Sequence, residues 1–182
     1  FANTEKDVID DFVFCCKTIG IPTSVSQYAA NHKTIRLNGG ESTRAFFERH
    51  DLMGKNSYQK RIPELVRLSG KSVLSNFMGA YWACDGMIEV RATRARNSTY
   101  RSSCTTVSKQ LAEDIVYALM ILGIAGRLRK KSRALNTAAQ PGGSYVSYNV
   151  EISSEIETSQ FKFLSGLSLR KRLLAEQCRE GF

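Results

Sequence analysis

The chain has 182 residues, of which 42% are hydrophobic and 24% are charged, the composition of an ordinary globular protein. This length is enough to bury a sizeable core without disulfides or a structural metal. No apolar run approaches the length of a membrane span, and Phe1 does not open a signal peptide. We therefore expect neither an integral membrane protein nor a secreted one.

Charge is the first informative quantity. The chain carries 26 basic and 17 acidic residues, a net charge of +9, and the excess is uneven: +2 in residues 1–69 and +7 in residues 70–182. A clustered basic surface favours a polyanionic partner, for which nucleic acid is the usual identity. Charge alone leaves open a basic protein that is merely soluble.

The chain has five cysteines and two histidines, which limits the metal sites and disulfides that it could form. No pair of cysteines has C-x-x-C spacing, so the sequence does not predict a zinc site. Cys15, Cys16 and Cys84 lie in apolar helical stretches and are expected to be small core residues. We therefore expect a reducing, intracellular location, in the cytoplasm, the nucleoid or an organelle.

An internal repeat organises the chain. The helical pattern of residues 4–21 matches that of residues 107–124 at a constant shift of 103, with Val8 on Leu111 and Asp11 on Asp114. Both patterns end in glycine, at Gly20 and Gly123, as a helix C-terminus often does. The same unit of helix, hairpin and helix therefore occurs twice.

The elements that follow each repeated helix agree between the copies. In the first copy we expect strands over 23–30 and 33–38, a turn at 31–32, and a helix over 42–50. In the second copy we expect strands over 126–134 and 144–153 around a turn at 140–143. A closing helix is then predicted over 155–164.

The second copy has additional elements before its repeated helix. A helix is predicted over 72–84 with Ser72 as its N-cap, followed by a hairpin of strands over 87–96 and 100–106. The first copy lacks counterparts of this helix and most of this hairpin, so the chain looks like a fragment. The resulting domains are a truncated first half (1–50), a connecting segment (51–70) and a complete second half (71–182).

Alternating residues predict a basic, polar sheet face. Arg127, Arg129, Lys131 and Arg133 occupy alternate positions, which places them on one side of a strand. Because such cations repel one another without a polyanion, we expect this face to bind DNA. A solvated face with scattered cations is the alternative. The residues predicted to contact DNA are Arg91, Thr93, Arg94, Arg96, Arg101, Arg127, Arg129, Lys131, Arg133, Ser147 and Asn149, with Ser24, Ser26, Tyr28 and Arg36 in the first copy.

The segment from Phe77 to Gly86, FMGAYWACDG, resembles the signature helix of LAGLIDADG homing endonucleases, which ends in Asp-Gly. The resemblance implies an α+β fold of αββαββα repeats, with saddle-shaped antiparallel sheets and helices on one face. It also implies that Gly79, Ala80 and Ala83 allow two such helices to cross closely, and that Asp85 binds the metal. A simple helix-terminating turn is the alternative for Asp85-Gly86.

Two further blocks carry the resemblance. Lys60-Arg61-Ile62-Pro63 resembles the Lys-x-Ile-Pro block of the intein-associated endonucleases, and residues 107–124 resemble the helix after the first hairpin. The match implies metal-assisted phosphodiester hydrolysis, with Mg²⁺ as the expected ion and Lys60 assisting catalysis. Lys171 is the candidate counterpart of Lys60. Lys60 as one more solvated cation remains the alternative.

Two nucleic-acid functions therefore remain open, besides a basic intracellular domain unrelated to nucleic acid. The first is a site-specific endonuclease for double-stranded DNA, as the endonuclease part of an intein. The second is a non-cleaving nucleic-acid-binding module, such as a maturase, a regulator or a decayed endonuclease. Only one signature helix is visible, so the second catalytic acid is expected from an upstream segment or a second chain.

Overall fold

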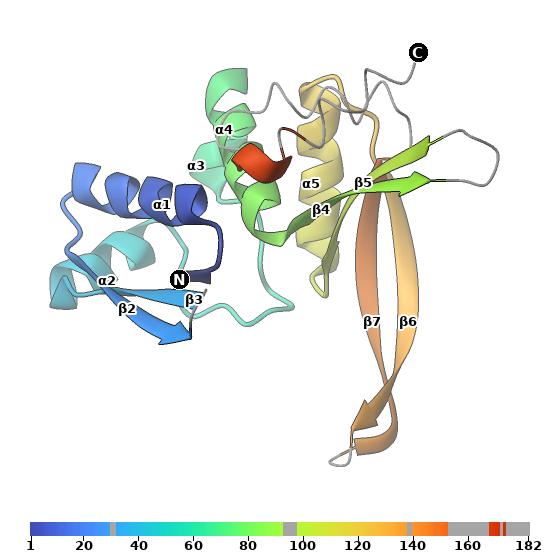
Figure 1. Cartoon of the computed structure of the whole chain (residues 1–182), viewed down its shortest axis with the longest axis horizontal. Coiled ribbons are helices and arrows are strands. Elements are labelled where there is room, and N and C mark those ends of the chain that lie inside the picture. The colour runs from blue at the N-terminus through green and yellow to red at the C-terminus, as the bar shows by residue number, and fades with distance from the viewer. Residues whose placement is uncertain (30–31, 93–97, 138–139, 153–167, 172, 174–182) are drawn as a thin grey trace. The chain divides into compact units, whose positions relative to one another are not determined.

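The computed structural model describes residues 1–29, 32–92, 98–137, 140–152, 168–171 and 173. The chain divides into two compact units, Phe1–Gly54 and Lys55–Phe182. Each has its own antiparallel sheet and its own helices, as the colours of Figure 1 show along the chain. Within the described ranges, no helix is long and apolar enough to cross a membrane.

The first unit is a small sheet with helices. Its elements are β1 (Ala2–Asn3), α1 (Lys6–Thr18), β2 (Thr23–Ala29), β3 (His32–Leu37) and α2 (Gly40–Arg49). The strands lie in the order β1-β3-β2 and all neighbours are antiparallel. The buried apolar residues come from α1, from the turn after it and from the central strand: Val8, Ile9, Cys16, Ile21 and Ile35.

The second unit contains the longer series of elements. They are α3 (Glu64–Arg67), α4 (Lys71–Asp85), β4 (Gly86–Ala92), β5 (Ser98–Thr106), α5 (Lys109–Ile121), β6 (Arg127–Thr137) and β7 (Gln140–Ile152). The antiparallel sheet has the order β4-β5-β7-β6, and Figure 1 shows α4 running directly into β4. This confirms the α+β class and the helix–hairpin–helix–hairpin order; the closing helix expected over 155–164 lies outside the described residues.

The repeat is visible in the backbone at the two helix ends. Gly20 and Gly123 have φ angles of 77° and 83°, a left-handed conformation that glycine adopts without strain. In each copy, the amide of the residue after the glycine donates to the carbonyl five residues earlier. Ile21 donates to Cys16 and Ile124 to Leu119, each over 2.8 Å. These paired bonds satisfy carbonyls that a helix end leaves open. The shift of 103 therefore relates identical caps.

The core of the second unit lies between its helices and one face of its sheet. Leu74, Met78 and Trp82 of α4 pack with Ile115 and Leu119 of α5. The sheet contributes the apolar half of each strand's alternation, including Ile88, Cys104, Val150 and Ile152. Ile62, from the segment expected to be a mere connection, is 1% exposed and joins this core.

Helix capping differs from the sequence expectation. Ser72 is the second residue of α4, and Gly70 is the N-cap, so the prediction for Ser72 is wrong. A serine cap does begin α5: the Oγ of Ser108 accepts from the amide of Leu111 at 3.1 Å and donates to the carbonyl of Lys60 at 2.7 Å. Both polar demands of this buried hydroxyl are thereby satisfied.

Two other expectations are also corrected. Residues 140–143 are not a turn, because β7 begins at Gln140 and pairs with β6 through a bulge near Leu135. Cys16 is buried, but Cys15 and Cys84 are exposed. Adjacent helical residues point about 100° apart, so only one of Cys15 and Cys16 can face the core.

Replacing Ser108 with alanine should lower the free energy of unfolding of the second unit by about 1–2 kcal/mol, because it removes a cap and leaves the Lys60 carbonyl without this donor. The matched change Ser72→Ala should cost less than about 0.5 kcal/mol. Urea unfolding followed by the fluorescence of Trp82, the single tryptophan, measures both. Equal losses for the two variants would contradict the assignment of the caps.

Candidate functional site

Asp85 is placed by the junction between α4 and β4. It is the last residue of α4 and is exposed, and Gly86 after it pairs with Cys104 at the start of the sheet. A Cβ at Gly86 would lie 2.3 Å from Cδ1 of the Trp82 indole, so this position requires glycine. The φ of Gly86 is −84°, so close approach and not a left-handed turn explains the residue. The carboxyl is therefore held at the edge where helix and sheet meet.

The residues beside Asp85 are neutral. Burial, followed by the negative charge of Asp85, raises the pKa of the Cys104 thiol to about 12. The pKa of Tyr81 is also raised, first by burial and then by the nearby Cys104 and Asp85. Both groups therefore remain protonated near neutral pH. Two charged groups of the described residues lie at this end of α4, the Asp85 carboxylate and the ammonium of Lys171.

Lys171 is held against the end of α4. Its side chain is buried, and its Nζ donates to the carbonyls of Trp82 and Ala83 over 2.6 and 2.7 Å. These carbonyls belong to the last turn of the helix, where a cation is favoured by the helix dipole. The structure thus brings Lys171 to within two residues of Asp85 along the helix, with its ammonium bonded to backbone.

Lys60 is exposed, but its backbone is fixed. The carbonyl of Lys60 accepts from Ser108 at the start of α5. The next two residues are held by Asp114, which accepts from the Arg61 guanidinium at 3.1 and 3.2 Å and from the Ile62 amide at 3.1 Å. Ser108 follows Cys104 by four residues, a span of at most about 14 Å. The backbone of Lys60 is therefore held at the start of α5, four residues after Cys104, which pairs with Gly86.

The donor set at Asp85 fits a partly hydrated divalent cation. Mg²⁺ is commonly held by one or two carboxylates together with substrate phosphates and waters. Asp85 supplies one exposed carboxylate, and the adjacent helix end supplies no competing basic side chain other than the backbone-bonded Lys171. Over the described ranges, no cluster of three or more histidine, cysteine or acidic residues could hold a metal without other ligands.

The predicted helix-interface residues divide by exposure. Gly79 and Ala83 are buried, and Ala80 is exposed. Val73 and Cys84 are also exposed on α4. A helix crossing through Gly79, Ala80 and Ala83 stays a prediction.

The open face of the second sheet contains the expected basic residues. Arg127, Arg129 and Lys131 of β6 lie opposite Glu151, Asn149 and Ser147 of β7, and residues opposite each other share a face. Arg101 and Ser103 of β5 lie on the same face through the pairing of Ser103 with Glu151. The opposite face carries the core residues Ile88, Cys104 and Val150. The alternation predicted for these strands is confirmed.

The sequence suggested that the cations on this face repel one another. In the structure, an acid of the neighbouring strand pairs with three of them. Glu151 is 6% exposed and pairs with Arg101, with Arg129 at 3.0 Å and with Lys131 at 3.4 Å. Burial opposes ionisation of Glu151, but Arg101, Arg129 and Lys131 outweigh it and lower the pKa of the carboxyl. The expectation missed Glu151 because it considered the cations of one strand and not the acid that lies opposite them on β7.

Several predicted contact residues lie at the limits of the structure. The backbones of Arg91 and Arg133 are described within β4 and β6, whereas Thr93, Arg94 and Arg96 lie outside the described residues. In the first unit, Ser24 pairs with Arg36 and Ser26 with Thr34, so these share a face. Tyr28 falls where the register shifts between Gln27 and Ala29, which interrupts the alternation.

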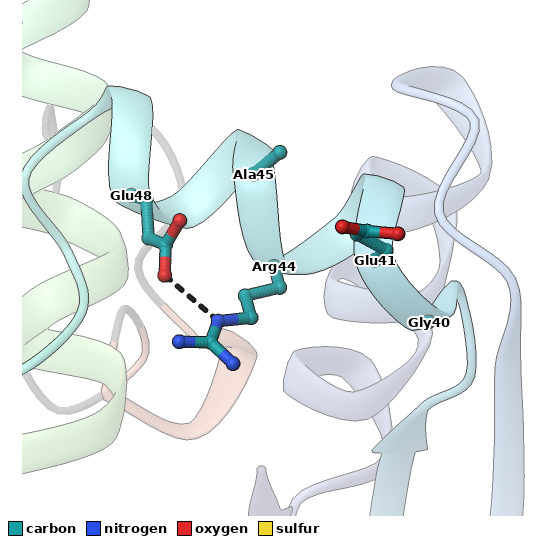
Figure 2. A pocket seen from close by; sticks show the side chains of 5 residues that line it. All are labelled: Gly40, Glu41, Arg44, Ala45 and Glu48. Atoms are coloured by element: carbon teal, nitrogen blue, oxygen red, sulfur yellow. Dashed lines mark hydrogen bonds and ion pairs between the residues drawn. The ribbon is translucent and has the colours of Figure 1, made fainter.

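A pocket in the first unit lies apart from these residues. Figure 2 shows it along α2, lined by Gly40, Glu41, Arg44, Ala45 and Glu48. The guanidinium of Arg44 pairs with Glu48 at 2.8 Å, and both side chains are largely exposed. Arg44 and Glu48 thus neutralise each other through an ordinary i, i+4 pair. None of the residues singled out by the sequence lines it.

Comparisons with known proteins agree with the geometry. The model of the LAGLIDADG-like domain matches residues 72–166. The chain is 33% identical over 139 residues to the replication factor C small subunit of Methanocaldococcus jannaschii, covering 76% of this chain but 6% of that protein. It is 31% identical over 110 residues to the replicative DNA helicase DnaB of Rhodothermus marinus, covering 60% of this chain and 11% of that protein. The chain thus spans a small part of these curated relatives.

Solved structures share the fold at low sequence identity. Mesophilic variants of the homing endonuclease I-DmoI superpose with a TM-score of 0.56 at 13% identity, covering 97% of this chain and 81% of that one. The complex of I-DmoI with DNA and Ca gives a TM-score of 0.57 at 12% identity with the same coverage. The signature helix, the sheet and the family match over more than half of the sequence lead to one conclusion: the chain belongs to the LAGLIDADG-like domain family.

Proposed function

We propose that this chain is a DNA-cleaving module, specifically a site-specific endonuclease for double-stranded DNA that requires a divalent metal. The observation that carries the proposal is the position of Asp85, an exposed carboxylate at the end of α4 where the helix enters the sheet. The polar face of that sheet, opposite the face that packs in the core, presents Arg101, Arg129 and Lys131. An acid beside a basic strand surface is the arrangement that hydrolysis of a bound phosphodiester requires.

Each residue has a distinct role in this proposal. The cations of β5 and β6 bind phosphates and base edges. Ser147 and Asn149, which the sequence predicted to contact DNA, are only 1% and 3% exposed, so they are assigned no contact. In the first unit, the residues predicted to contact DNA are Ser24, Ser26, Tyr28 and Arg36. Asp85 holds the divalent ion, for which Mg²⁺ is the natural candidate, and the bound ion supplies charge stabilisation and an activated water. Lys60 stabilises negative charge that develops on the phosphate.

Lys171 acts as a positioning residue in this account. Its buried ammonium is bonded to the Trp82 and Ala83 carbonyls, so it fixes the last turn of α4 and supports the adjacent carboxylate. A direct contact with the scissile phosphate is disfavoured, because the ammonium is buried and directs two of its three N–H groups to these carbonyls. Charge-assisted bonds of this kind are among the stronger interactions in a protein.

An intein as the parent protein is supported by the relatives. The chain aligns with 6% of a protein named as a replication factor C small subunit and with 11% of one named as a DnaB helicase. A short segment shared by otherwise different proteins is the pattern expected of an inserted element. The Lys60-Arg61-Ile62-Pro63 block supports the same subtype. The free cysteines at 15, 16, 84 and 104 are consistent with a reducing, intracellular location.

A non-cleaving DNA-binding module is the second candidate. One observation favours it: within the described part of the chain, Asp85 belongs to no group of three or more histidine, cysteine or acidic residues that could hold a metal ion. In that case a second signature helix, from another segment or another chain, would be needed for cleavage. Such a module would bind duplex DNA in the presence of a chelator and leave it intact.

Replacing Asp85 with asparagine should abolish cleavage and leave binding intact, because the amide is a poor ligand for a hard divalent cation. A randomised duplex library incubated with Mg²⁺ and the chain should yield one enriched cut site. We expect Asp85→Asn to lower the rate at that site by at least about 100-fold. Asp10→Asn, at an exposed pair with Lys6, is the matched control and should cut normally.

The outcomes of this experiment separate the candidates. Cutting by Asp85→Asn at the normal rate would refute the role of Asp85. Binding without any cutting by the unaltered chain would support the non-cleaving module. An absence of duplex binding even at low salt would refute both candidates.

Replacing Lys171 with methionine should reduce the cleavage rate by about 10-fold or more while the affinity for the duplex stays within about 2-fold, because the buried ammonium holds the helix end and not the phosphates. Lys109→Met, at an exposed pair with Glu113, is the matched control. Single-turnover rates and equilibrium binding measure the two quantities separately. A loss of affinity equal to the loss of rate would indicate that Lys171 contacts DNA directly.

A further inference from the structure

The polar face of the second sheet contains two acids: Glu89 on β4, opposite Arg101, and Glu151 at the centre of the face. Glu151 lies on β7, between β5 and β6, and its side chain is bonded on both sides. Arg101 reaches it from β5, and Arg129 and Lys131 reach it from β6. Asn149, two residues earlier on the same strand, donates its amide to Oε1 at 2.5 Å. Asn149 is fixed in turn by the hydroxyl of Thr105 at 2.8 Å.

The cations around Glu151 remain accessible while the acid does not. The side chain of Glu151 is 7% exposed, whereas those of Arg101, Lys131 and Arg129 are 29%, 37% and 51% exposed. An approaching polyanion therefore meets three guanidinium or ammonium groups that already share one carboxylate. Arg127, directly opposite Glu151 in the register, has no ion pair with it among the described contacts.

This arrangement has two physical consequences. The carboxylate holds the long side chains of the three cations in place before DNA binds. These side chains therefore lose less rotamer freedom on binding, which lowers the entropic cost of their contacts with DNA. It also opposes every phosphate that approaches the three cations, because like charges repel across the partly desolvated face. Sequence-specific contacts, which depend on exact geometry, therefore contribute a larger share of the binding free energy than they would without the carboxylate. Non-specific attraction to the DNA backbone contributes a smaller share.

We propose that Glu151 is a specificity-determining residue for duplex DNA, an internal counter-anion that orients Arg101, Arg129 and Lys131 and suppresses their non-specific attraction to phosphates. This inference rests on the proposed DNA-binding function. Glu151 itself touches no DNA in this account. It acts through the three cations that surround it.

Replacing Glu151 with glutamine tests the proposal, since it removes the charge and keeps the shape. The probes are a duplex enriched from a randomised pool by the unaltered chain and a scrambled duplex of the same composition. With a chelator present and at fixed salt, we expect Glu151→Gln to bind the scrambled duplex about 10-fold more tightly. The preference for the enriched duplex should fall by a similar factor. Glu113→Gln, at an exposed i, i+4 pair, is the matched control and should change neither quantity.

A second pair of variants keeps the test decisive if Glu151→Gln unfolds, which Trp82 fluorescence would report. Arg129→Gln removes one of the three cations paired with the carboxylate, so that less of its charge is neutralised. Arg127→Gln removes a cation of the same strand face that forms no ion pair with Glu151 among the described contacts. We expect Arg129→Gln to lower the affinity for the scrambled duplex at least about 3-fold more than Arg127→Gln does. Equal weakening, or unchanged binding and preference in a folded Glu151→Gln, would overturn the inference. If the unaltered chain binds neither duplex, the proposed function fails instead.

Discussion

The packing of Trp82 at the end of α4 is the constraint on which the rest of the second unit depends. The indole is fully buried, and its Nε1 donates to the Ser102 hydroxyl of β5 at 2.8 Å. It fills the space that a Cβ at residue 86 would occupy. The helix end, the first residue of β4 and the middle of β5 are therefore joined by one side chain. A substitution at any of these points would move Asp85 relative to the sheet.

This constraint gives the Asp-Gly pair of the signature segment a physical explanation. The glycine is not required for its backbone conformation, because its φ angle is one that any residue adopts. It is required because a large aromatic ring approaches the backbone there. The acid before it is then left at the helix end with an exposed carboxyl, beside the half-buried Tyr81 and the buried Cys104. Packing and the proposed chemistry thus depend on the same residues.

Much of the fold could be predicted because its signals are local or periodic. The shift of 103 located both copies of the repeated helix, and the period of two in residues 127–131 located a strand face. Helix starts were less predictable, since Ser72 and Ser108 look alike in sequence. Only Ser108 has the Leu111 amide and the Lys60 carbonyl within reach.

The charge balance of the sheet face could not be predicted from single strands. Glu151 is separated by 50 residues from Arg101 and by 20 from Lys131, and strand register alone brings them together. A count of charges along each strand therefore overestimates the positive field of a sheet. The buried bonds of Lys171 to α4 have the same origin, because residues 88 and 89 apart meet only in the fold.

The claim that Asp85 holds a divalent ion at this junction can be tested without any cleavage. Mn²⁺ in place of Mg²⁺ broadens the amide signals of nearby residues in an NMR spectrum of the labelled chain bound to a short duplex. The account predicts selective broadening at Cys84, Asp85, Gly86 and Cys104, lost in Asp85→Asn while the duplex remains bound. Broadening that persists in this variant, or that centres on residues of another element, would contradict it.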